Sequence, residues 1–145
     1  MLDELIKWVG IVAPLALGSL GSSIGCVIAG MGMCGAMPRI KTGHGGLAAM
    51  SAAPSTQIIY GLVLMMFMKG KMAGANTLSP AAFLAVGLLC GTAIMVSAIV
   101  QGKCCAAGMR ATVEEKSVFG KCWVPIGITE SFAVFSMIFG MIVLS

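Results

Sequence analysis

Four long apolar stretches run along this chain, and each is long enough to cross a lipid bilayer as a helix. The hydrocarbon core of a membrane requires about 20 consecutive apolar residues for one helical span. Together the four stretches use most of the 145 residues, which leaves no room for a separate water-soluble catalytic domain. The predicted spans cover residues 8–36, 47–68, 80–108 and 122–144. We therefore predict an all-α membrane protein with four transmembrane helices.

The composition argues against a soluble domain. Only 10% of the residues are charged and the mean hydropathy is +1.03, whereas soluble domains carry about 25% charged residues. The acidic opening from Met1 to Lys7 is unlike a secretory signal, so we expect the first stretch to remain as a span. The basic residues lie in short connections without interleaved aromatic residues, which argues against nucleic-acid binding. The six cysteines form no CxxC pair and are expected to be small packing residues.

The spans alternate in character, which predicts a duplicated helical hairpin. The first and third spans carry glycine and alanine at spacings of three and four residues, and such stripes let helix backbones approach closely in lipid. The second and fourth spans are rich in bulky apolar residues that suit lipid contact. We predict a first hairpin over residues 1–70 and a second over residues 71–145. When the second and fourth spans are aligned, Gln57 falls on Glu130.

The basic residues predict the orientation in the membrane. Positively charged residues are enriched in cytoplasmic connections. The first and third connections with their flanks carry more of them than the opposite side, namely Arg39, Lys41, Lys103, Arg110, Lys116 and Lys121 against Lys7, Lys69 and Lys71. Both termini are therefore expected on the non-cytoplasmic side. We expect His44 in a solvated loop, a second connection from Lys69 to Ser79, and a helix start at Ser79–Pro80.

Glu130 is the residue most costly to place in a membrane. It is the only acidic residue within a predicted span and lies nine residues into the fourth, which is near mid-membrane at about 1.5 Å per residue. An ionisable side chain at this depth marks a functional site by default. A structural role is the alternative, in which Glu130 pairs with a cation such as Lys103, although that lysine lies toward the cytoplasmic end of its span.

Two buried amides accompany this carboxylate. Gln57 and Gln101 lie within the second and third spans, and Thr56 and Tyr60 share a helix face with Gln57. These side chains offer hydroxyl, amide and carboxylate oxygens, which hard cations prefer. One negative charge suits one monovalent cation. A proton is the alternative, but a proton site would not require two glutamines, so we favour sodium. Hydrogen bonding between helices remains the simpler explanation for each amide.

The motifs together resemble a known family. They are Pro-x-Thr-Gln-x-x-Tyr-Gly in the second span, Gln-Gly-Lys in the third and Thr-Glu-Ser-Phe-Ala in the fourth. With the small-residue stripes they resemble the K subunit of V/A-type rotary ATPases, the 16 kDa proteolipid. The resemblance implies a rotor ring of identical subunits in a prokaryotic cell membrane, with the first and third spans inside the ring. It implies no catalytic activity of the single subunit and no cofactor apart from the carried Na⁺ or H⁺.

The resemblance also implies roles for individual residues. Glu130 would be the ion carrier, and sodium ligands would fall on Thr56, Gln57, Gln101 and the backbone oxygen of Ala53. Tyr60 would hold Glu130 by a hydrogen bond. The expected partners are the a/I-type stator subunit, which supplies half-channels, and a central-stalk subunit that contacts cytoplasmic residues 37–46 and 110–121.

Two other classes are possible from the residues. Small cation or drug exporters also have four spans and one buried glutamate, but they carry the acid in the first span and line a pocket with aromatic residues. Here the first span has no acid, and aromatic residues make up 6% of the chain. A purely structural four-span protein would not require Glu130 together with Gln57 and Gln101.

Overall fold

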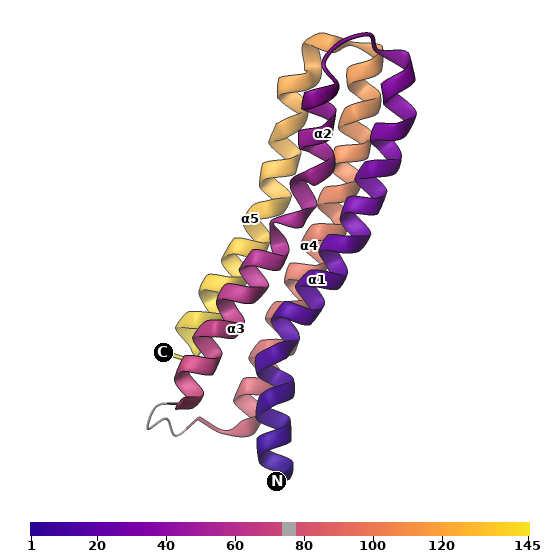
Figure 1. Cartoon of the computed structure of the whole chain (residues 1–145). Coiled ribbons are helices and arrows are strands. Elements are labelled where there is room, and N and C mark those ends of the chain that lie inside the picture. The colour runs from indigo at the N-terminus through magenta and orange to yellow at the C-terminus, as the bar shows by residue number, and fades with distance from the viewer. Residues whose placement is uncertain (74–77) are drawn as a thin grey trace.

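The structure of the chain is a computed structural model that describes residues 1–73 and 78–145. Within these residues the chain forms helices and turns without strands, which confirms the all-α prediction (Figure 1). The long helices are α1, α3, α4 and α5, and the shorter elements are α2 and the 3₁₀ turns η1, η2 and η3. Their bounds are α1 Leu2–Ala36, η1 Met37–Arg39, α2 His44–Ala52, η2 Ala53–Ser55, α3 Gln57–Ala73, α4 Pro80–Glu114, η3 Lys116–Val118 and α5 Phe119–Val143.

Four helical segments among the described residues are long and apolar enough to cross a membrane, as predicted. They are Leu2–Arg39, His44–Met72, Pro80–Glu114 and Lys116–Val143. Their ends differ from the predicted ends, mostly because the helices continue into polar sequence. At 35 residues, α1 and α4 are each about 52 Å long, whereas the hydrocarbon core is about 30 Å thick. Their charged ends therefore extend into water.

The helix starts follow local chemistry. Asp3 and Glu4 lie in the first turn of α1, where acidic side chains stabilise the positive end of the helix dipole, so α1 begins before the predicted residue 8. The predicted start of α4 is confirmed: the Ser79 hydroxyl accepts the N–H of Ala82 at 3.2 Å, and Pro80 occupies the first turn. The predicted connection from residue 69 is shorter than expected because α3 continues to Ala73, and positions 74–77 lie outside the described residues.

The second span is interrupted near its middle. Residues Ala53–Ser55 form the 3₁₀ turn η2 between α2 and α3, with Pro54 at its centre. Proline lacks an N–H and its ring clashes with the preceding turn, so it can end a helix. By contrast, α1 contains Pro14 and α5 contains Pro125 without interruption. The break therefore distinguishes the second span from the fourth.

The small-residue stripes of α1 and α4 pack against each other within one chain. A Cβ built on Gly10 would lie 2.4 Å from the Phe83 carbonyl oxygen, and a Cβ on Gly102 would lie 2.3 Å from the Gly25 carbonyl oxygen. Contacts therefore advance together along both helices, which run parallel. The predicted close approach of backbones is confirmed.

The bundle places the two termini at one end and two connections at the other (Figure 1). Helix α1 contacts α3 and α4, and α5 contacts the same two helices. Large apolar side chains remain exposed along α5, including Val124, Ile128, Phe132 and Phe139. This surface suits lipid or a neighbouring subunit. The helix bounds do not test the duplication of the hairpins, which stays a prediction.

Candidate functional site

Glu130 lies close to the middle of α5, within the span Lys116–Val143. Its side chain is half-buried, and its Oε1 accepts a hydrogen bond from the Tyr60 hydroxyl at 2.7 Å. This bond joins α3 to α5. Along the described ranges the one ion pair is Lys7–Glu4 at 3.8 Å, and Lys103 is exposed. The structure therefore brings Tyr60 to Glu130 and does not pair the carboxylate with Lys103.

Gln57 and Gln101 meet between the helices. Both side chains are fully buried, and the amide nitrogen Nε2 of Gln57 donates to Oε1 of Gln101 at 2.9 Å. Gln101 Nε2 in turn donates to the carbonyl of Ile126 at 3.0 Å. These bonds join α3, α4 and α5, as expected for helix–helix hydrogen bonds. Ion ligation by the same amides stays a prediction.

The break in the second span brings two further predicted residues together. The Thr56 hydroxyl donates to the Ala53 carbonyl at 3.1 Å, and the Thr56 N–H donates to the same oxygen at 3.3 Å. The Thr56 hydroxyl also lies 3.4 Å from Oε1 of Gln57. Because η2 replaces regular helix here, the carbonyl of Ala53 is placed beside a hydroxyl and an amide instead of within an α-helical ladder.

The predicted residues thus form two contact groups. One contains Ala53, Thr56, Gln57 and Gln101, and the other contains Tyr60 and Glu130. They are connected through α5, because Gln101 binds the Ile126 carbonyl one helical turn before Glu130. One carboxylate can neutralise a single positive charge, and neutral oxygens add ligands without further charge, so the two groups together have the chemistry of a monovalent cation site.

The sequence alone did not reveal a third polar contact at this site. The Ser97 hydroxyl donates to the Thr129 carbonyl at 2.5 Å, and Ser97 is 5% exposed. The Thr129 hydroxyl also donates to the Ile126 carbonyl at 2.8 Å. The only available signal was that Ser97 lies four residues before Gln101, on the same face of α4.

Comparison with known proteins shows what kind of protein this chain resembles. The family model of the ATP synthase C subunit matches residues 84–143, which cover most of α4 and all of α5. The chain is 33% identical over 150 residues to the A-type ATP synthase subunit K of Methanocaldococcus jannaschii. The chain is thus similar to the C/K proteolipid subunits of ATP synthases. The alignment takes in 99% of the chain and 64% of the length of that relative.

Four helical segments that can span a membrane, together with the match to a membrane ATP synthase subunit, support an integral membrane protein. The matched region includes Gln101 and Glu130, together with Ser97 and Thr129. It begins after Pro80 and so lies within the second hairpin. The family match therefore applies most directly to α4 and to α5, which holds the carboxylate.

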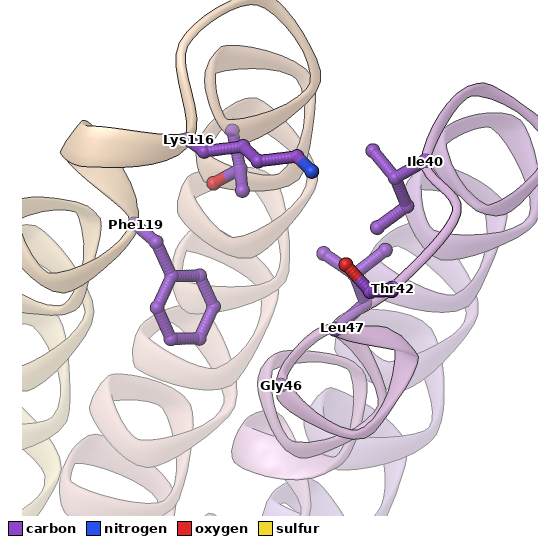
Figure 2. A pocket seen from close by; sticks show the side chains of 8 residues that line it. Ile40, Thr42, Gly46, Leu47, Lys116 and Phe119 are labelled. Carbon is purple, nitrogen blue, oxygen red and sulfur yellow. The ribbon is translucent and has the colours of Figure 1, made fainter.

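A separate hollow lies at the end of the bundle opposite the termini, with a volume of about 360 Å³. Figure 2 shows Phe119 and Lys116 on one side of the hollow, and Ile40, Thr42 and Leu47 on the other. Gly46 allows α2 to lie close to the Phe119 ring, since a Cβ at Gly46 would lie 2.7 Å from that ring. His44 is the first residue of α2 instead of a loop residue, and it is exposed as expected. The hollow joins the two connections and lies apart from Glu130.

Proposed function

We propose that this chain is the ion-carrying subunit of a membrane rotor ring in a V/A-type ATPase or ATP synthase, and that Glu130 carries the ion. The contact between Tyr60 and Glu130 at 2.7 Å in mid-span is the observation that carries the proposal. A buried carboxylate in a membrane is costly, and the tyrosine hydroxyl holds it in one position on the face of α5. Exchange of one cation at this carboxylate would be coupled to ring rotation, and ATP chemistry would take place on other subunits.

Sodium is the ion that the surrounding oxygens favour. A sodium ion would take oxygens from Thr56, Gln57, Gln101, Glu130 and the Ala53 carbonyl. Four of these five residues are already in contact with one another, and a rigid arrangement of ligands lowers the cost of binding. A proton would require only the carboxyl group, so it leaves the buried amides without a role in the carried ion.

We propose that each chain carries one ion. The first hairpin has Gln57 where the second has Glu130, and Gln57 is fully buried. An amide supplies an oxygen ligand without a charge, so the first hairpin adds to the site formed with the second instead of forming its own.

The partners follow from the family and the topology. Identical subunits would form the ring, and an a/I-type stator subunit would face the exposed side of α5. Residues 37–46 and 110–121 would face the cytoplasm of a prokaryotic cell and contact the central stalk, with both termini on the opposite side. The hollow of Figure 2 supports this last contact, because both connections line it and Lys116 can meet an acidic partner there.

Carbodiimide labelling of the intact complex in lipid vesicles tests the proposal. We expect one modification per chain, mapped to Glu130 by mass spectrometry, with parallel loss of coupled ATPase activity. Millimolar sodium at constant pH should slow the labelling. Labelling that sodium does not slow would refute the sodium assignment and favour protons. Equal modification of Glu114 and Glu130 would refute the assignment of Glu130 as the carrier.

A further inference from the structure

Two hydrogen bonds from α4 act on the backbone that positions Glu130. The Ser97 hydroxyl donates to the carbonyl of Thr129, and Gln101 Nε2 donates to the carbonyl of Ile126. Ser97 and Gln101 lie four residues apart and therefore share one face of α4. Both are buried, at 5% and 0% exposure, so neither bond competes with water.

The two carbonyls are directly connected to Glu130. The peptide bond between Thr129 and Glu130 is planar, so a bond to the Thr129 oxygen constrains the plane that contains the Glu130 Cα. In a regular α-helix the N–H of Glu130 donates to the carbonyl of Ile126. The bond from Ser97 thus orients the peptide between Thr129 and Glu130. The bond from Gln101 holds the Ile126 carbonyl, which accepts the Glu130 N–H.

We propose that Ser97 is a positioning residue for the Glu130 carboxylate, acting with Gln101 as a clamp on this turn of α5. The inference rests on the proposed role of Glu130. Among the described residues the Ser97 hydroxyl bonds to the Thr129 carbonyl and to none of the proposed ion ligands. It instead fixes the direction in which Glu130 leaves α5, and so keeps the carboxylate within reach of Tyr60 and the amide oxygens.

The first hairpin provides the matched control. Ser22 is also a buried serine, at 7% exposure, on the small-residue helix α1. It lies one turn after Gly18, which approaches the Gln57 backbone, and one turn before Gly25, which approaches Pro54. Its hydroxyl is a buried polar atom without a hydrogen-bond partner in the described structure. Ser22 therefore has the burial of Ser97 and a similar position, but no hold on a neighbouring helix.

The experiment measures the carbodiimide labelling rate of Glu130 in the assembled complex, without sodium and over a sodium titration at constant pH. In Ser97→Ala, the sodium concentration that gives half protection should rise about fivefold, as expected for the loss of a hydrogen bond of ordinary net strength. Ser97→Thr retains the hydroxyl and should restore most of the affinity. Ser22→Ala should leave the half-protecting concentration unchanged and raise the thermal stability, since it removes an unpaired buried hydroxyl.

The outcomes separate positioning from general packing. If Ser97→Ala lowers the melting temperature but leaves both the labelling rate and the half-protecting concentration unchanged, the clamp is refuted. An equal change in Ser22→Ala would refute it too. If sodium does not protect wild-type Glu130, the sodium assignment fails separately. The sodium-free labelling rate then decides, and a change in Ser97→Ala that Ser97→Thr reverses still supports the clamp.

Discussion

The two predicted hairpins of this chain are built alike but differ where the ion chemistry is expected. Each pairs a helix rich in small residues with a bulkier partner span. In the first, the partner span is broken at η2 and carries the fully buried amide of Gln57. In the second, α5 is continuous and carries the half-buried carboxylate of Glu130. The first hairpin thus offers only neutral oxygens here, whereas the second offers the carboxylate together with the amide of Gln101.

The difference in exposure is as important as the difference in charge. The proposed carrier must meet both its ligands and the path of ion exchange, and Glu130 is half-buried on α5, in contact with Tyr60 but not enclosed. Gln57 lies against α1, where a Cβ built on Gly18 would come within 3.1 Å of the Gln57 carbonyl oxygen. A charge at that position would be buried without access to water, which is costly.

Exchanging the two side chains would produce the largest effect. We expect Glu130→Gln to reduce ion-coupled ATP hydrolysis to background, because the carried charge is lost. The double variant Gln57→Glu with Glu130→Gln should not recover activity, since position 57 is fully buried. ATP-driven ion uptake into vesicles measures the activity of both variants. Recovery in the double variant would show that the hairpins are interchangeable and that exposure does not decide the carrier.

The contact between the hairpins should be the next most sensitive. Gly102→Ala places a Cβ 2.3 Å from the Gly25 carbonyl oxygen, so α4 must move away from α1. We expect a loss of about 2 kcal/mol or more in stability, within the range for overpacked cores, measured by thermal unfolding in detergent. Gly35→Ala is the control because its Cβ would have open space. Equal stability in the two variants would contradict the tight packing.

The two prolines near the site offer a finer comparison. Pro54→Ala should allow α2 and α3 to join, so that the Ala53 carbonyl accepts a regular helical bond and is less available to sodium. We expect the half-protecting sodium concentration to rise about fivefold, equivalent to about 1 kcal/mol. Pro125→Ala should have little effect, because α5 is already continuous at Pro125. Similar changes in both variants would show that the break itself is not part of the site.

The two connections at the end of the bundle opposite the termini should respond slightly differently to acidification. Glu115 Oε1 accepts the Ser117 N–H at 3.0 Å, and this bond holds the pKa of the carboxyl below its ordinary value of 4.5. The contribution of this hydrogen bond to stability is therefore present above pH 4.5. It is lost as the pH falls through the lowered folded-state pKa. The first connection leads into α2 without a side-chain cap.

Hydrogen exchange around residues 115–118 should accordingly increase on acidification in the wild type. The exchange should vary less with pH in Glu115→Gln, whereas exchange around residues 43–46 should be insensitive to this substitution. An identical pH response in the wild type and Glu115→Gln would rule out the cap as the cause.

The sequence predicted the spans and the central residues because their signals are local. Apolar length located the helices, and the cost of burying Glu130 marked it without any contact information. The effect of Pro54 was not predictable in the same way, since Pro14 and Pro125 lie in continuous helices. Whether a proline ends a helix depends on the packing around it, and Pro54 lies against Gly25 of α1.

The contact that Ser97 makes was likewise not predictable from the sequence. Serine is common among small residues in membrane helices, and its contact with Thr129 joins residues 32 positions apart. Ser22 and Ser97 look alike in sequence, yet only Ser97 has an acceptor. The paired amides were predictable as polar residues in spans, but their direct contact at 2.9 Å depends on how α3 and α4 pack.

The number of sodium ions bound per chain tests the single-carrier site most directly, measured with radioactive sodium on the purified assembly at constant pH. We predict one ion per chain, with binding abolished by Glu130→Gln and retained in Ser22→Ala. Two ions per chain, or one ion that survives Glu130→Gln, would contradict the assignment of a single carrier to the second hairpin.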